Sequence, residues 1–276
     1  MGSHSDPESG SMEGPRVFAA DNAGPFTLDG TRTFIVGSSA VAILDPGPDA
    51  QPHLDRLVRA VATADTGTIL LTHLHADHSA GAATLSGRTG FPIAGPGRSL
   101  GQEVKPGDRI ETDAGALEAI PTPGHSRDHL AYLLHRDRSL FVGDLVLGKG
   151  TTTWVGGYGG CVADYLASLD RIEALEPSRL LPAHGPPLES PREAIRAFRE
   201  HRLKRIGQVE RALSELGMSG FVTDPSRVEQ LVDRLLIAVY PSDLPAPARE
   251  GAKWSLHAVL EYLEVAPFPE EPSPDD

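Results

Sequence analysis

Three histidines and one aspartate stand within six residues of this chain. The stretch "LTHLHADHSAG" places them as His73, His75, Asp77 and His78. Imidazole nitrogens and carboxylate oxygens are usual zinc ligands, at about 2.0–2.2 Å. The chain has only 11 histidines in 276 residues, so a His-x-His-x-Asp-His pattern would arise by chance in about one such sequence in a thousand. The pattern favours a metal-binding loop over a polar loop that is merely rich in histidine.

The spacing within this stretch predicts two neighbouring metal ions. His73 and His75 are two residues apart, so in an extended segment their rings point to the same side and can reach one ion. Asp77 and His78 follow at the turn into a helix, where Asp77 can also cap the helix, and both can face a second ion. Candidates for the remaining ligands each follow a predicted strand: His125 in "PTPGH", Asp144 in "FVGD" and His184 in "LPAHG".

Seven ligands for two ions fit a site in which Asp144 bridges the metals. Two ions about 3.5–4 Å apart can share a water molecule and lower its pKa towards ~7. We expect the resulting metal-bridging hydroxide to be the nucleophile of a hydrolysis, with one ion polarising a carbonyl or phosphoryl oxygen. Asp77 is the candidate catalytic residue that orients this hydroxide and accepts a proton. Two Zn²⁺ are the expected cofactors, and Mn²⁺ or Fe²⁺ are alternatives because these ligands accept all three.

Each of the later ligands has a plainer explanation when taken alone. His125 could be a turn residue, Asp144 a cap, and His184 part of a surface loop. Their order along the chain, each closing a strand, favours ligation. The other histidines lack such settings and are expected at the surface or as supports of a ligand, His129 being the candidate support: His53, His129, His135 and His201.

Alternating strands and helices up to residue 190 position these side chains. Apolar residues that are β-branched or aromatic, bounded by Pro and Gly, indicate strands, and 3–4 residue spacing indicates helices. The expected order is strands at 31–37 and 39–48, a helix at 50–64, strands at 67–70 and 115–125, a hairpin at 129–144, a helix at 161–177 and a strand at 178–187. Ligands at strand ends are held by a rigid scaffold.

The composition changes near Ser190, after which the chain is mostly helical. Residues 191–266 are predicted to form a small helical domain that follows a catalytic domain at 16–190. The segments 1–15 and 267–276 are rich in Gly, Ser, Pro and acidic residues and are expected to be disordered.

The bulk composition excludes several classes of protein. No run of about 18 apolar residues exists, so no membrane span is expected. The single cysteine, Cys161, and the absence of a recognisable leader favour a cytoplasmic protein. The net charge of −13 argues against a protein built mainly to coat nucleic acid. The composition does not indicate an oligomeric state.

The ordered motifs "THLHADHSAG", "PTPGHSRDH", "FVGD" and "LPAHG" resemble those of the metallo-β-lactamase superfamily over about residues 16–190. The resemblance implies an α/β fold, a four-layer αββα sandwich with a dimetal site at one edge of two facing sheets. It also implies how the ligands divide between the ions: His73, His75 and His125 on the first, Asp77, His78 and His184 on the second, and Asp144 bridging.

A finer resemblance is to the lactamase-beta-2-like branch. It rests on "GPFTLDGTRTFIVG", "GDLVLGKGTTTW", "HRLKRIGQVERAL" and "KWSLHAVLEYLE", and it implies a winged-helix-like C-terminal domain. One departure separates the chain from true β-lactamases. The two-zinc members of that group do not bridge their metals with an aspartate at the Asp144 position, so antibiotic hydrolysis is not expected.

Three functions remain open. The first is hydrolysis of a small ester, thioester or lactone. The second is cleavage of single-stranded RNA, known in eukaryotic relatives of the branch, which needs a cationic track; residues 192–211 carry seven basic side chains against three glutamates. The third is a binding module that acts through the winged helix. A module of this kind would not need seven metal ligands. The glycine-rich loop 148–161 is the candidate substrate-side element.

Overall fold

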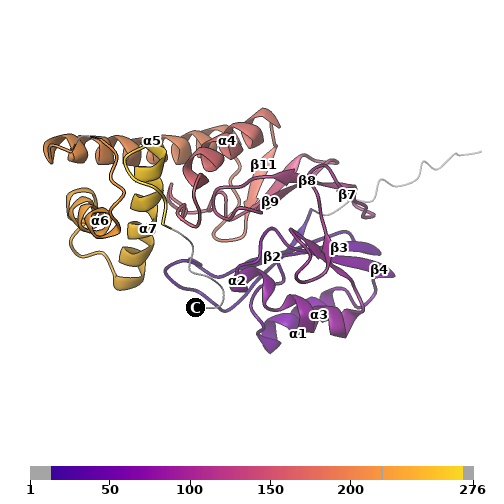
Figure 1. Cartoon of the computed structure of the whole chain (residues 1–276). Coiled ribbons are helices and arrows are strands. Elements are labelled where there is room, and N and C mark those ends of the chain that lie inside the picture. The colour runs from indigo at the N-terminus through magenta and orange to yellow at the C-terminus, as the bar shows by residue number, and fades with distance from the viewer. Residues whose placement is uncertain (1–13, 219, 270–276) are drawn as a thin grey trace, which may run out of the picture.

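Two β-sheets packed face to face form the centre of the molecule, and helices cover both outer faces (Figure 1). The computed structural model describes residues 14–218 and 220–269. Most of the two segments expected to be disordered therefore lies outside the described residues. The layers run helix, sheet, sheet, helix, as the sequence resemblance implied.

The first sheet has six strands in the order of the chain. The first three strands pair antiparallel and the next three join in parallel. The strands are β1 (Arg16–Ala19), β2 (Arg32–Val36), β3 (Ala40–Leu44), β4 (Thr66–Leu70), β5 (Ile93–Gly95) and β6 (Gln102–Glu103). The parallel pairing brings the carboxyl ends of β3 and β4 to the same edge, which is where functional groups gather in such sheets.

The second sheet has five strands in the order β11-β10-β9-β8-β7. β10 and β11 are parallel, and the other pairs are antiparallel. Their bounds are β7 (Arg109–Ile110), β8 (Leu117–Pro121), β9 (Leu130–Leu134), β10 (Ser139–Gly143) and β11 (Arg179–Pro182). The segment after β4 meets the second sheet at the start of β9, where Leu130 N–H donates to Thr72 O at 2.8 Å. Because β9 is antiparallel to β10 and β10 is parallel to β11, the carboxyl ends of β10 and β11 lie at this same edge.

Alternation along the strands divides the apolar side chains between the layers, because successive residues point to opposite faces. In β3, Val41 and Ile43 face the outer helices, whereas Ala42 and Leu44 face the other sheet. Helices α1 (Gln51–Ala60) and α3 (Ala82–Thr89) cover the outer face of the first sheet. Helix α4 (Cys161–Ala174) covers the second sheet in the same way. The expected strands and helices up to residue 190 are thus present, with shorter bounds.

Three helices follow the second sheet: α5 (Pro191–Glu215), α6 (Pro225–Val239) and α7 (Ala246–Tyr262). They share one apolar core with α4 and the outer face of the second sheet. Among the described residues after β11 there is no strand, so the β-hairpin that would make a wing is not seen and the winged-helix expectation is not confirmed. The proposed boundary at 190/191 stays a prediction. No helix in the described part of the chain is long and apolar enough to cross a bilayer.

Candidate metal centre

The seven predicted ligands lie together at the edge where the parallel strands of both sheets end. The loop after β4 carries four of them, partly on the short helix α2 (Ala76–Ser79). The other three follow β8, β10 and β11. Their side-chain nitrogen and oxygen atoms form two groups, and within each group all ligand atoms lie within 4.8 Å of one another: His73, His75 and His125 in one, and Asp77, His78, Asp144 and His184 in the other.

The first group consists of three imidazole rings. His75 Nδ1 lies 3.0 Å from His73 Nε2 and 2.9 Å from His125 Nε2. Burial lowers the pKa of all three rings, that of His125 to about 4. These rings are therefore neutral near pH 7 and offer lone pairs, the form that binds a metal ion.

The second group combines two imidazoles with two carboxylates. His184 Nε2 is 3.2 Å from Asp77 Oδ2 and 3.3 Å from Asp144 Oδ1. His78 Nε2 is 3.4 Å from Asp77 Oδ2 and 3.5 Å from Asp144 Oδ2. Burial alone would lower the pKa of His184, but the two carboxylates raise it to about 9. The same negative potential would attract a metal cation to this group.

Asp144 connects the two groups. Its Oδ2 atom lies 3.6 Å from His125 Nε2 in the first group and 3.5 Å from His78 Nε2 in the second. Burial would raise the pKa of Asp144, but the rings of His78 and His184 hold it well below its usual range. An ionised carboxylate in this place can face both groups at once.

Hydrogen bonds on the far side of the rings fix which nitrogen faces inward. His78 Nδ1 lies 3.0 Å from Asp45 Oδ2, His125 Nδ1 3.1 Å from Trp154 O and His184 Nδ1 3.4 Å from Gly30 O. An acceptor on Nδ1 places the ring proton there and leaves the Nε2 lone pair free. This arrangement of outer partners is typical of metal-binding histidines.

Three buried atoms of the second group support metal binding more directly. His78 Nε2, His184 Nε2 and Asp144 Oδ1 have no hydrogen-bond partner among the described residues. A buried polar atom without a partner costs about 1–3 kcal/mol, and here all three point into one small volume. A bound cation would satisfy them together. The residues present therefore fit a two-metal centre.

Two supporting residues complete the centre, and the sequence singled out only one of them. Asp45, directly after β3, accepts from the Thr72 amide and hydroxyl at 2.8 Å each, besides its contact with His78. It was overlooked because an aspartate before Pro and Gly is typical of a turn. His129 is buried, and its Nε2 accepts from the Asp144 backbone N–H at 3.2 Å. It therefore supports Asp144.

Other sequence expectations need correction. Asp77 does not cap a helix: it lies within α2, whose N-cap is His75, and no side chain caps that helix. His53 is neither at the surface nor in contact with a predicted ligand. It is 2% exposed in α1, and its Nε2 lies 3.0 Å from Thr33 Oγ1.

A cavity of about 740 Å³ opens on the metal centre. His75, Asp77, His125 and Asp144 lie at one end of it. Its other walls come from the loop 148–155 and from the C-terminal helices and the turn before α7, with apolar side chains that include Trp154, Leu244 and Trp254. The loop after β10 is thus a cavity wall, held by Thr153 Oγ1 donating to Asp144 O at 2.8 Å and by Ser255 Oγ donating to Val155 O at 2.9 Å.

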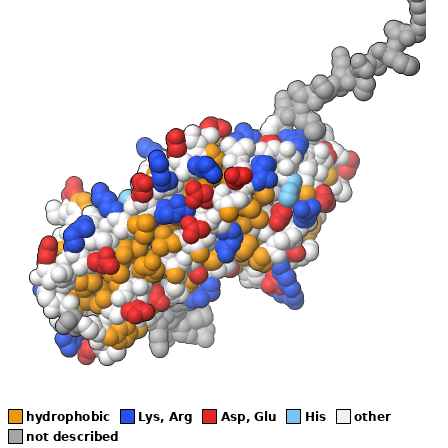
Figure 2. All heavy atoms as spheres, turned by 90° about the horizontal axis from the view of Figure 1, so that it is seen from above, with side chains coloured by type: hydrophobic (Ala, Val, Ile, Leu, Met, Phe, Trp, Pro, Cys, Tyr) orange, Lys and Arg blue, Asp and Glu red, His pale blue; other side chains and the backbone are white. Residues whose placement is uncertain are grey.

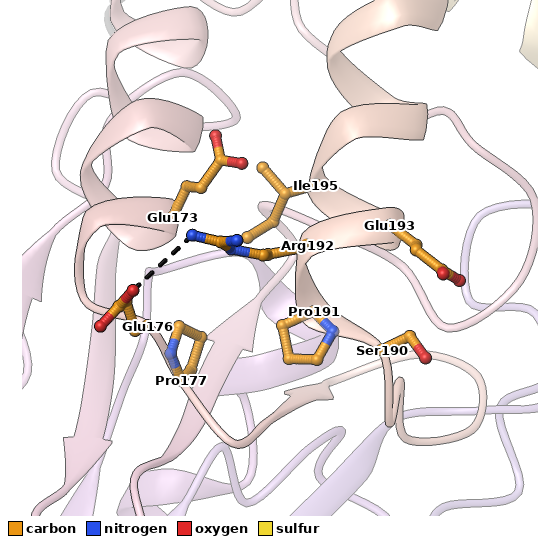
Figure 3. Close-up of a pocket in the computed structure, with 8 residues that line it drawn as sticks. All are labelled: Glu173, Glu176, Pro177, Ser190, Pro191, Arg192, Glu193 and Ile195. Atoms are coloured by element: carbon orange, nitrogen blue, oxygen red, sulfur yellow. Dashed lines mark ion pairs between the residues drawn. The ribbon is translucent and has the colours of Figure 1, made fainter.

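A smaller groove of about 280 Å³ lies between the end of α4 and the start of α5 (Figure 3). Its wall carries Glu173, Glu176 and Glu193, and Arg192 pairs with Glu176 at 3.6 Å. None of the seven clustered side chains lines it. The large cavity is therefore the one associated with the centre.

Known proteins are similar to this chain in sequence. The profile of the Metallo-beta-lactamase superfamily matches residues 28–102 and 94–184. The "Beta-lactamase-like protein 2 homolog" of Caenorhabditis elegans is 33% identical over 208 residues, 70% of this chain and 69% of that protein. The "Atrochrysone carboxyl ACP thioesterase" of Aspergillus fumigatus is 28% identical over 241 residues, 80% of this chain and 75% of that protein.

Solved structures show the same fold at low sequence identity. A beta-lactamase domain protein from Burkholderia ambifaria aligns with a TM-score of 0.73 at 22% identity, covering 90% of this chain and 84% of that one. A metallo-beta-lactamase family protein from Thermus thermophilus aligns with a TM-score of 0.67 at 21% identity, covering 91% and 93%. Through its sequence matches, the chain belongs to the metallo-beta-lactamase superfamily.

Proposed function

We propose that this chain is a dinuclear-metal-dependent hydrolase of a small ester, thioester or lactone. His73, His75 and His125 would hold one ion, Asp77, His78 and His184 would hold the other, and Asp144 would be shared between them. The observation that carries the proposal is the convergence of seven side chains, three of whose buried polar atoms make no hydrogen bond within the described chain. Zinc suits this mixture of imidazole and carboxylate, and Mn²⁺ or Fe²⁺ fits the same ligands.

The bound ions would supply an activated water and polarise the oxygen of the scissile bond. The chain's own groups do the rest. The carboxylate of Asp77 lines the cavity, and its side chain remains 31% exposed. Burial would raise its pKa, but the rings of His184 and His78 hold the pKa below its usual range, so the group is an ionised base. It is placed to accept the proton that leaves the attacking water.

A thioester is favoured within this class because one relative is named as a thioesterase that acts on an acyl carrier protein. The cavity supports a small substrate with an apolar part, since Trp154, Leu244 and Trp254 are among its lining residues. These apolar walls would hold the acyl chain and keep bulk water from the scissile bond.

The face of α4 and α5 gives no support to an RNA track. Two arginines of α5 on this face pair with carboxylates: Arg199 with Asp170 at 2.8 Å and Glu173 at 2.7 Å, and Arg196 with Glu200 at 3.7 Å. Figure 2 shows acidic side chains interspersed with basic ones over the face seen there. A phosphate backbone would meet mixed charge, whereas a track needs an excess of cations.

Metal analysis and a substrate panel test the proposal. Elemental analysis of the purified protein should give about two metal ions per chain. Thioester, lactone, phosphodiester and single-stranded RNA substrates are then compared with and without a chelator. We expect thioester or lactone turnover that the chelator abolishes and added metal restores. Turnover confined to RNA, or turnover unaffected by complete metal removal, would overturn the proposal.

A further inference from the structure

The cavity contains a second polar feature, at the wall formed by α5. Arg202 is only 5% exposed, yet no carboxylate lies within 4.0 Å of its guanidinium among the described residues. Arg205, one turn later, is partly buried and also lacks a carboxylate partner within the described chain. Both line the same cavity as the metal centre. Their neighbours Arg196 and Arg199 on the same helix are ion-paired. Arg202 and Arg205 are the arginines of this helix that line the cavity, and they do so without a carboxylate partner in the described part of the chain.

The groups around Arg202 fix its guanidinium in place but supply no negative charge. Nη2 donates to Thr153 O at 3.1 Å, and the guanidinium lies over the Tyr165 ring, 5.5 Å from its centroid. Its Nε is buried and has no partner among the described residues. A buried cation without a counter-ion is costly. An arginine fixed by a carbonyl and an aromatic ring, with a donor to spare, is therefore a candidate ligand-binding group.

Arg205 is arranged in the same manner. Nη1 donates to Val239 O at 2.7 Å, and the guanidinium lies over the Tyr240 ring, 4.1 Å from its centroid. Guanidinium groups stacked on aromatic rings keep their edge donors in place for carboxylate or phosphate oxygens. Lys149 also lines this cavity, and the wall carboxylate Glu250 lies beyond ion-pair distance of both arginines.

Trp154 contributes a second buried donor without a partner among the described residues. Its indole Nε1 has no hydrogen-bond partner in the described chain, although the side chain forms part of the cavity wall next to Thr153. Buried Trp N–H groups usually find a partner. Two adjacent elements, α5 and the loop after β10, thus both carry buried unsatisfied donors on residues that line the cavity.

We propose that the substrate carries an anionic group, a carboxylate or a phosphate, that Arg202 and Arg205 bind while its scissile carbonyl lies at the metal centre. The substrate class is an ester or thioester with a negative charge away from the bond that is cleaved. This inference rests on the proposed function for the identity of the scissile bond. The anion subsite itself depends only on the arginines and the cavity.

Fluorescence tests the subsite without any turnover. Both tryptophans of the chain, Trp154 and Trp254, line the cavity, so their emission should report a bound anion. Glutarate and methylphosphonate are titrated into the metal-loaded wild type, Arg205→Gln and the control Arg196→Gln, whose side chain is exposed and paired with Glu200. We expect saturable binding that weakens about 10-fold or more in Arg205→Gln and is unchanged in the control.

Kinetics identify the anion and its place in the substrate. The probes are N-acetylcysteamine thioesters with a succinyl chain, a 3-phosphonopropanoyl chain or the neutral pentanoyl chain. We expect kcat/KM for one of the anionic probes to exceed that for the neutral probe by about 10-fold or more, through KM, and the ratio to fall towards one in Arg205→Gln and in Arg202→Gln. The preferred probe distinguishes carboxylate from phosphate.

The outcomes separate the two proposals. Equal kcat/KM for charged and neutral thioesters, or anion binding that is the same in wild type and in Arg205→Gln, overturns the subsite. Failure to hydrolyse any thioester or lactone overturns the proposed function, while the fluorescence titration still decides the subsite. Should the arginine variants lose cleavage of single-stranded RNA instead, the small-molecule assignment is overturned.

Discussion

The Nδ1 atom of His78 lies 3.0 Å from the Oδ2 atom of Asp45. The same carboxylate receives the Thr72 hydroxyl at 2.8 Å, and that hydroxyl lies 3.0 Å from His73 Nδ1. Asp45 thus orients one ring in each of the two groups of clustered side chains: it contacts His78 directly and His73 through Thr72. Its backbone is in the left-handed region, with φ of 49°, a conformation that aspartate and asparagine adopt more readily than other side chains.

We predict that Asp45→Asn weakens metal binding while preserving the fold. Asparagine fits the same backbone conformation, but it lacks the charge that holds the His78 ring. Loss of such an outer partner typically costs about 10–100-fold in metal affinity. Competition with a chromogenic chelator measures the affinity, and elemental analysis gives the metal content.

The matched control for this variant is Asp113→Asn. Asp113 also accepts backbone N–H groups, from Ser38 and Ser39 at 2.9 and 2.8 Å, but it is exposed and is not among the clustered residues. Its variant should bind metal as the wild type does. Equal affinities for wild type, Asp45→Asn and the control would show that Asp45 has no part in the centre.

Asp77→Asn separates proton transfer from metal binding. The amide can still offer an oxygen to a metal but cannot accept a proton, so kcat should fall by at least ~10²-fold with metal content largely kept. Steady-state kinetics and elemental analysis on the same sample provide the two readouts. Asp128→Asn, an exposed residue near the centre, makes the same change in charge and should keep kcat. A fully active Asp77→Asn enzyme with two bound ions would exclude the role as a base.

The sequence predicted which seven residues cluster at the candidate metal centre, because they lie in the segments that follow β4, β8, β10 and β11. The ends of such strands are visible as apolar runs cut off by Pro, Gly or a polar residue. The sequence did not predict Asp45, because its local pattern is that of an ordinary turn. The sequence also did not predict that Arg202 and Arg205 line the cavity. A basic stretch on a long helix has no local mark of which arginines face a cavity, since that depends on the packing of α5 against α4 and α7.

The C-terminal helices show the same limit. Helical spacing predicted a helical segment over residues 191–266, and the structure has α5, α6 and α7 there. The winged-helix expectation came from the resemblance alone. Helix periodicity says nothing about whether a short strand pair lies between helices, and the described residues contain no such strands there.

The stability of the fold should fall at acid pH partly because of His53. The Thr33 hydroxyl donates to Asp45 O at 2.7 Å and so accepts from His53 Nε2, while His53 Nδ1 accepts from Arg56 Nη2 at 3.2 Å. The contact with Arg56 requires the neutral ring, because a protonated Nδ1 cannot accept a hydrogen bond, whereas Nε2 donates to Thr33 in either form. Burial lowers the pKa of His53, and Arg56 lowers it further. His53 therefore becomes protonated near pH ~6.5 in the unfolded chain but only at a lower pH in the folded chain. The free energy of unfolding that His53 contributes is fully present above that pH and decreases as the pH falls below it.

Urea unfolding at about pH 8 and about pH 5.5 measures this contribution. We expect the free energy of unfolding to decrease less between the two pH values in His53→Gln than in the wild type, because glutamine does not titrate. His135→Gln removes an exposed ring and should not reduce the decrease. Identical pH dependence in wild type and His53→Gln would contradict the prediction.

Gly143, the residue before Asp144, should not tolerate a side chain. Its φ is 49°, and a Cβ there would lie 2.6 Å from His129 Nε2 and 2.7 Å from Thr72 Oγ1. Gly143→Ala therefore adds the cost of a left-handed alanine, about 1–2 kcal/mol, to the displacement of two side chains that support the metal centre. Gly90→Ala has the same backbone problem, with φ of 74°, but nothing lies within 4 Å of its Cβ. Thermal unfolding should show a larger loss for Gly143→Ala, and only that variant should lose metal. If both variants lost the same stability and kept their metal, the close packing around Asp144 would not matter for the centre.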